Sequence, residues 1–282
     1  MRKKYFADLI LLLAAMIWGL GYFFQKAASE TTPPLTFNLL RYLIAALFLA
    51  VITRFRYPRG KGLKFAVLTG IVMSCAGNMQ QIGMKTASIG NASFITAIYI
   101  VLVPFLSALI LRRRIKPNHL LAALLSLAGL YLITTGGRGL EQISSGDMLV
   151  FVGSIFWALQ ILCVDKGVTL CSPIPFTAAS FLAAAIFETF IWLTLGHGDL
   201  TGISHSWPYA AASGILVLGV AFIMQAYGQK NTSETEASII MGLESVFGAL
   251  FGILFYRETF VPLQLAGMAL IFAAVLLVVL KE

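Results

Sequence analysis

Ten apolar stretches, each long enough to cross a lipid bilayer, constrain this chain more than any other feature. They alternate with short segments rich in charge, proline or glycine. A spanning helix needs about 20 apolar residues, so ten of them occupy roughly 200 of the 282 positions and leave no room for a soluble domain. The sequence predicts an all-α membrane protein with ten transmembrane helices, at residues 8–27, 35–53, 64–84, 90–111, 117–135, 147–168, 174–195, 208–229, 235–256 and 262–280.

The chain also repeats itself. Asp8 and Trp18 recur as Asp147 and Trp157, each 139 residues later. From the third helix onward the matching residues are 145 apart, and they include Met79 and Met224, Gln80 and Gln225, Lys85 and Lys230, and Pro117 and Pro262. Because each half holds five helices, an odd number, the second half must enter the membrane from the opposite side. We therefore predict two inverted five-helix repeats, residues 1–139 and 140–282.

Basic residues in the connections predict the orientation. Fifteen Lys and Arg residues fall on the side of the N-terminus, and four fall on the other side, namely Lys26, Lys85, Arg138 and Arg257. Since cytoplasmic loops carry an excess of Lys and Arg, we expect a multi-pass protein of the cytoplasmic membrane with both termini in the cytoplasm. The net charge of +8 does not indicate nucleic acid, because the basic residues form short runs between apolar segments.

Residues that mark metal, cofactor or enzyme chemistry are not arranged for it. Cys75, Cys163 and Cys171 form no CxxC pair and no metal-ligand spacing with the three histidines. The sequence contains no GxxxxGK[ST] phosphate loop and no HExxH motif. We expect no metal, no cofactor, no catalytic residue and no direct use of ATP. A membrane-embedded enzyme and a non-transporting assembly protein are the alternatives to a transporter.

A polar side chain inside the hydrocarbon layer is costly, and it usually faces a partner or a water-filled cavity. In the third helix, Ser74, Asn78, Gln81 and Lys85 share one face. We expect Asn78 and Gln81 to line a substrate cavity, and hydrogen bonding between helices is the alternative.

Two tryptophans at matching repeat positions lie near the middle of their helices, whereas membrane tryptophans usually lie at the interfaces. Trp18 shares a helix face with Tyr22, and Gln160 lies one turn beyond Trp157. We predict that these four side chains contact substrate. Buried aromatic packing is the alternative.

Two further polar pairs stand out. Gln80 and Gln225 are repeat counterparts at opposite depths, so they would either gate opposite mouths of the pathway or bond to nearby backbone. Gln225 is also a candidate for the substrate site. Arg41 and Glu188 lie at similar depth in the second and seventh helices and are candidates for pairing. Arg41 is predicted either to bind substrate or to hold helix ends together.

Glu244 lies about 13 Å along its helix, at 1.5 Å per residue, and so near the bilayer midplane. Desolvation disfavours an ionised carboxylate there, so we predict that Glu244 binds substrate and exchanges a proton during transport. Its repeat counterpart Tyr99 lies at the same level and is a further candidate for the substrate site. A protonated Glu244 bonded to a backbone carbonyl is the alternative.

Four segments have a familiar pattern, namely WGLGYFFQKA, FWALQILCVDK, FNLLRYLIAA and LFYRETFVPLQLAGMALIFAAVLLV. Together they resemble the EamA family of the drug/metabolite transporter superfamily. The last one carries the acid, glutamine and glycine that usually end a repeat of this family, as Glu258, Gln264 and Gly267, whereas the first repeat has Arg113 in place of the acid.

This resemblance implies a ten-helix transporter with a central cavity and cytoplasmic termini, in a superfamily that moves amino acids, other metabolites, nucleotide sugars and drugs. We expect a secondary transporter that moves small metabolites, such as amino acids or related amphipathic compounds, by alternating access, with export the usual direction. Its expected partners are a small-molecule substrate, protons, and membrane lipids at the run from Arg112 to Arg114. The sequence leaves a monomer and a homodimer open.

Overall fold

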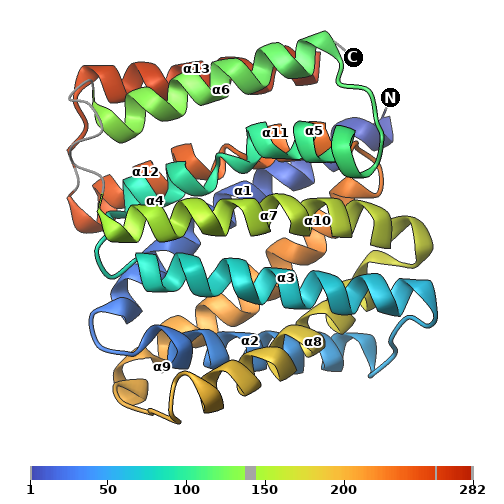
Figure 1. Ribbon diagram of the computed structural model, residues 1–282, viewed down its shortest axis with the longest axis vertical. Coiled ribbons are helices and arrows are strands. Elements are labelled where there is room, and N and C mark those ends of the chain that lie inside the picture. The colour runs from blue at the N-terminus through green and yellow to red at the C-terminus, as the bar shows by residue number, and fades with distance from the viewer. Residues whose placement is uncertain (1, 137–143, 258, 281–282) are drawn as a thin grey trace.

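A computed structural model describes residues 2–136, 144–257 and 259–280, and all regular structure in these ranges is helical (Figure 1). The first half holds α1 (Arg2–Ser29), α2 (Pro34–Thr53), α3 (Lys61–Gly83), α4 (Ile89–Thr96), α5 (Tyr99–Ile110) and α6 (Pro117–Thr135). The second half holds α7 (Ser145–Leu170), α8 (Pro173–Thr194), α9 (Ile203–Ala212), the π-helix η1 (Ser213–Val220), α10 (Ala221–Gln229), α11 (Glu234–Met241), α12 (Glu244–Tyr256) and α13 (Pro262–Leu280).

The helices have the length and surface of a multi-pass membrane protein. Eight helical segments of the described residues are long and apolar enough to span a bilayer, and two shorter apolar helices lie within α6 and α13. Large apolar side chains face outward, and Leu109 is 77% exposed. Many polar side chains are turned inward, among them Gln81 and Glu188. This distribution of apolar and polar groups suits a hydrocarbon solvent. The expectation of an all-helical membrane protein is confirmed.

Local sequence explains where several helices begin. Pro34, Pro117, Pro173 and Pro262 each occupy the first position of a helix, where the missing N–H is no loss. At α7, Ser144 and Asp147 form a capping box, in which Asp147 N donates to Ser144 Oγ and Ser144 N donates to Asp147 Oδ2.

Two helices that we predicted as continuous, at 90–111 and 235–256, are broken. Ile98 N donates to Ile95 O and Leu243 N donates to Ile240 O, each at 3.2 Å, so the backbone tightens into a 3₁₀-type turn at these points. Ile98 and Leu243 are 145 residues apart, so the breaks fall at matching repeat positions. The predicted helix at 208–229 also departs from a regular α-helix, because it contains η1.

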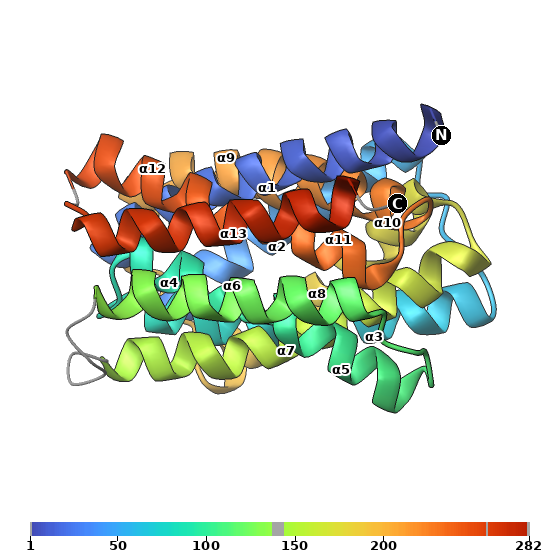
Figure 2. The ribbon, with the colours of Figure 1, turned by 90° about the horizontal axis from the view of Figure 1, so that it is seen from above.

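Two pairs of helices at matching repeat positions pack on each other. The counterparts α2 and α8 pack on each other, as do α6 and α13. In the ribbon, α6 and α13 form one edge, while α2, α8 and α9 form the opposite edge (Figure 1). Helices α1, α3, α7 and α10 cross the space between, and α12 lies along α1 (Figures 1 and 2). This arrangement brings both helix breaks to the centre.

Candidate functional site

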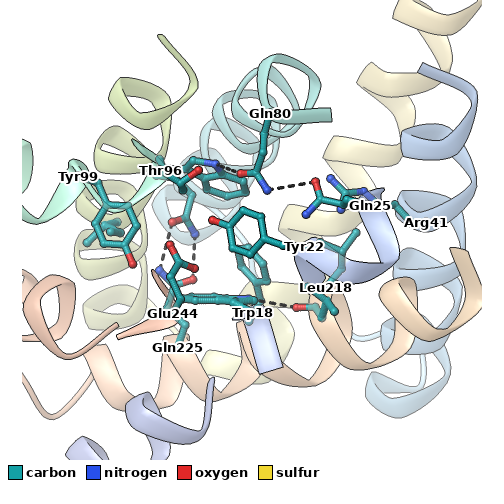
Figure 3. Close-up of a pocket in the computed structure, with 15 residues that line it drawn as sticks. Trp18, Tyr22, Gln25, Arg41, Gln80, Thr96, Tyr99, Leu218, Gln225 and Glu244 are labelled. Atoms are coloured by element: carbon teal, nitrogen blue, oxygen red, sulfur yellow. Dashed lines mark hydrogen bonds between the residues drawn. The ribbon is translucent and has the colours of Figure 1, made fainter. Parts of the chain in front are cut away.

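A cavity of about 50 Å³ lies at the centre of the bundle, lined by side chains from both halves. This volume holds a few water molecules. The lining comprises Trp18, Tyr22, Gln25, Arg41, Gln80, Thr96 and Tyr99 from the first half, and Trp157, Gln160, Ile161, Val217, Leu218, Phe222, Gln225 and Glu244 from the second. Figure 3 shows Arg41 and Gln25 at one end and Tyr99 and Glu244 at the other, with Tyr22 between them.

Aromatic rings form one wall of the cavity. The ring of Phe222 lies 5.1 Å from that of Trp18 and 6.0 Å from that of Trp157, measured between centroids. Trp18 Nε1 donates to Val217 O at 3.3 Å, and Trp157 Nε1 donates to Gln80 Oε1 at 2.9 Å. Both indoles are therefore held in place by polar contacts between the two halves.

Amide side chains join this wall in two groups. Gln80 Nε2 donates to Gln25 Oε1 at 3.1 Å, and Gln160 and Gln225 exchange two hydrogen bonds of 3.1 Å. The structure brings Gln80 and Gln225 to one cavity, where each bonds to another side chain rather than to nearby backbone. They contact α7 at Trp157 and Gln160, three positions and so about 4.5 Å apart along the helix, and both line one cavity.

Three buried polar atoms gather at the helix breaks. Thr96 lies at the end of α4, while Tyr99 and Glu244 begin α5 and α12. Thr96 Oγ1, the Tyr99 hydroxyl and Glu244 Oε1 make no hydrogen bond of good geometry with a described residue, although the hydroxyls of Tyr22 and Tyr99 lie beside the Glu244 carboxyl group. Buried polar groups normally have partners, so these three atoms are candidates to bind water or a ligand. The carboxylate of Glu244 also suits the positive end of the α12 dipole.

Eight of the ten residues predicted to bind substrate line the cavity, namely Trp18, Tyr22, Arg41, Tyr99, Trp157, Gln160, Gln225 and Glu244. Asn78 and Gln81 do not. Asn78 Nδ2 donates to Glu188 Oε2 at 2.9 Å, and Gln81 Nε2 donates to Gln25 O at 3.1 Å. Their expected exposure to the cavity is therefore corrected in favour of the alternative, hydrogen bonding between helices, because α3 packs between α7 and α8.

Other lining residues were not selected from the sequence. Thr96 could have been found, because it is a polar residue three positions before Tyr99 in the same apolar segment. Phe222, Val217 and Leu218 carry no polar signal, so only tertiary packing identifies them.

Charged side chains form a second feature, at the end of the bundle that holds the start of α1. In this ion-pair cluster, four ion pairs each join a base of the first half to an acid of the second. They are Lys4–Glu236 at 3.5 Å, Lys116–Glu236 at 3.9 Å, Arg113–Asp165 at 3.0 Å and the closer pair Arg113–Glu234, with His119 3.8 Å from Glu236.

Arg113 is the centre of this cluster. Partial burial disfavours its charge, but attraction to Asp165 and Glu234 outweighs burial and raises the pKa of Arg113. Ser107 also donates to Glu234. Arg113 stands where the second repeat has Glu258, and Glu258 lies outside the described residues, as do Arg138, Lys281 and the predicted boundary at 139/140. Gln264 caps the N-terminus of α13, since Val261 N donates to its Oε1 at 2.9 Å.

Comparison with known proteins agrees with this architecture. A crystal structure with 17% sequence identity superposes with a TM-score of 0.79, over 98% of this chain and 99% of that chain, which shows a shared fold. A protein of Archaeoglobus fulgidus named an uncharacterized transporter is 27% identical over 99% of this chain and 87% of its own length. The Escherichia coli K12 protein named uncharacterized inner membrane transporter YedA is 27% identical over 95% of this chain and 88% of its own.

The family assignment comes from both halves. The model of the EamA-like transporter family matches residues 5–135 and again residues 144–280. The two matches cover nearly the whole chain and include every helix that lines the cavity. The chain therefore belongs to the EamA-like transporter family.

Proposed function

We propose that this protein is a secondary transporter that exports small metabolites by alternating access, with the central cavity as its substrate site. Aromatic walls beside amide groups suit an amino acid or a related amphipathic compound. The observation that carries the proposal is the group of unpartnered polar atoms on Thr96, Tyr99 and Glu244, at two matching helix breaks facing one cavity. Transporters place substrate sites at discontinuous helices between their repeats. Export follows the usual direction for the family resemblance.

Alternating access is supported by the size of the cavity and by the contacts at one end. A cavity of about 50 Å³ is too small for a metabolite, so binding requires the halves to move. The ion-pair cluster joins the halves at the end that carries the start of α1. Opening that end would separate these charges, whereas opening the other end would leave them paired.

The proposed topology is ten spans of the cytoplasmic membrane in two inverted five-helix repeats, with both termini in the cytoplasm. Three broken or irregular segments, α4–α5, α9–η1–α10 and α11–α12, each account for one of these spans. The bias of Lys and Arg toward one side supports the orientation. A reporter that is active only in the cytoplasm should give a signal when it is fused to the C-terminus. A signal there from a reporter that is active only outside the cytoplasm would refute this topology.

Glu244 is the proposed proton carrier. The hydroxyls of Tyr22 and Tyr99 lie beside its carboxyl group, and Glu244 is buried at the cavity. An ionised carboxylate is strongly disfavoured when the site is sealed, and it becomes tolerable when water reaches it. Glu244 would therefore hold a proton in the closed cavity and release it on the side that opens.

The test compares Glu244→Gln with wild type in proteoliposomes under an imposed pH gradient. The substrate is first identified by screening metabolites for an increase in the melting temperature of purified protein. Glutamine keeps the size and polarity of the side chain but cannot ionise. Glu244→Gln should therefore bind substrate and lose accumulation driven by the pH gradient. Accumulation equal to wild type would refute proton coupling, and a lack of any substrate movement by wild type would refute transport.

A further inference from the structure

A buried chain of hydrogen bonds leads from the cavity wall to a second acid. Arg41 Nε donates to Asn38 Oδ1 at 2.8 Å, and Asn38 Nδ2 donates to Asn78 Oδ1 at 2.5 Å. Asn78 Nδ2 then donates to Glu188 Oε2 at 2.9 Å, and Ser74 also donates to this oxygen. Each amide accepts on the side of Arg41 and donates on the side of Glu188. This order is the one expected when a positively charged Arg41 and a negatively charged Glu188 are connected through two amide side chains.

The surroundings hold the guanidinium group firmly. Arg41 Cζ lies 5.7 Å from the ring centroids of both Phe37 and Tyr42, and Arg41 is only 2% exposed. A Cβ at Gly77 would lie 2.5 Å from the Tyr42 hydroxyl and 3.3 Å from Arg41 Nη2. Glycine at position 77 therefore leaves the room that these two side chains fill.

The fold itself does not require this chain of hydrogen bonds. The repeat counterparts of Asn38 and Arg41 are Thr177 and Ser180, 139 residues later. Their hydroxyls donate to carbonyls of their own helix, at 2.9 and 3.0 Å, and the counterpart of Glu188 is Leu49. The symmetry-related positions of the same α2–α8 contact thus pack without buried charge. Because buried ion pairs are weak evidence for stability, a functional reason for this one is favoured.

Arg41 is also placed to meet a ligand. It lines the cavity at the end opposite Glu244 (Figure 3). Its Nε bonds to Asn38, whereas its Nη groups make no hydrogen bond to the residues that the structure describes. A guanidinium with free donors in a dry site recognises carboxylate or phosphate groups.

We propose that Arg41 takes an anionic group of the substrate, and that Glu188 is the resident counter-ion of Arg41, held across Asn38 and Asn78. The inference rests on the proposed transport function and names the chemistry of its substrate, a small molecule with a carboxylate or a comparable anion. Glu188 balances the charge of Arg41 while the cavity is empty. It is a positioning residue and does not touch the substrate.

The pairing is tested by the melting temperatures of purified Arg41→Gln, Glu188→Gln and the double variant. Each single substitution leaves one buried charge without its partner, so each should lower the melting temperature by about 5 °C or more. The double variant removes both charges and should recover most of the loss. Additive losses would overturn the pairing.

The anion site is tested with phenylacetate and phenylacetamide, which share one shape and differ in charge. Wild type should be stabilised more by phenylacetate, and Arg41→Gln should lose this preference. In Glu188→Gln the ligand becomes the sole counter-ion of Arg41, so its affinity for phenylacetate should rise by about tenfold, with phenylacetamide unchanged. A merely structural Glu188 would not produce this gain.

Ser180→Ala is the matched control, because Ser180 is the repeat counterpart of Arg41 and bonds only within its own helix. It should leave both ligand responses as in wild type. Equal shifts with the two compounds, or no shift with either, would overturn the anion site. Since these are binding measurements in detergent, they fail or succeed independently of the transport assay.

Discussion

Arg113 provides the sharpest test of the proposal that the ion-pair cluster closes one end of the transporter. Its guanidinium pairs with Asp165 and Glu234, whose side chains are 8% and 3% exposed, while its own side chain is 45% exposed. Arg113→Gln removes the cation and leaves two nearly buried carboxylates without it. In any conformation that opens this end, water reaches the two carboxylates, so the substitution costs that conformation less free energy.

The magnitude follows from burial. Removing one partner of a fully buried ion pair costs about 3–5 kcal/mol, and an exposed pair contributes at most about 1 kcal/mol. The exposure of Arg113 places this pair between the two limits, so we expect a destabilisation of the closed end of about 2 kcal/mol. That free energy corresponds to a shift of about 30-fold in the equilibrium between closed and open forms.

The assay measures access from the proposed cytoplasmic side. Ile161 lines the cavity one turn before Asp165, so Ile161→Cys reports on a path through the ion-pair cluster. The three native cysteines are replaced by alanine, and a membrane-impermeant thiol reagent is applied to inside-out vesicles. Arg113→Gln should raise the rate of labelling at position 161 by up to about 30-fold.

Arg114→Gln is the control. Arg114 lies beside Arg113, and both line a second cavity of about 160 Å³, but no ion pair of Arg114 occurs among the described residues. It should leave the labelling rate near that of wild type. If Arg113→Gln labels no faster than Arg114→Gln, the ion-pair cluster does not close this end.

Two further predictions concern packing and hydrogen bonding between α3 and α7. A Cβ at Gly83 would lie 2.6 Å from Gly146 O, so Gly83→Ala should cost about 1–3 kcal/mol in thermal unfolding. Gly153→Ala, whose nearest contact is 3.2 Å, should cost less, and equal losses would contradict the reasoning. Trp157→Phe leaves Gln80 Oε1 without its donor and should cost about 1–3 kcal/mol, so a variant that melts like wild type would show that this bond does not stabilise the fold.

Much of the architecture was predictable because the membrane imposes simple rules. Apolar length predicted the helices, and Pro117 and Pro262 marked two of the starts that the structure shows. The repeat placed Tyr99 and Glu244 at one level, and mid-helix polarity selected Trp18 and Trp157, all of which line the cavity.

The breaks at Ile98 and Leu243 were not predictable in the same way. Apolar length reports that a segment can span a membrane, but it does not report whether the helix stays continuous within it. Only the neighbours that α4, α5, α11 and α12 pack against settle where each segment turns.

Side-chain direction depended on tertiary structure as well. Helical periodicity gives the angles between residues on one helix and leaves open which neighbour each face meets. The sequence therefore placed Gln81 on the polar face expected to line the cavity, whereas in the structure the adjacent Gln80 lines it and Gln81 bonds to Gln25 O. Similarly, the sequence alone gave Arg113 only as part of a basic run, because its acidic partners Asp165 and Glu234 are 52 and 121 residues away. The sequence by itself determined membrane insertion and the repeat, since both depend on local composition. The cavity, the ion-pair cluster and the buried chain from Arg41 required the packed helices, because each is assembled from residues distant along the chain.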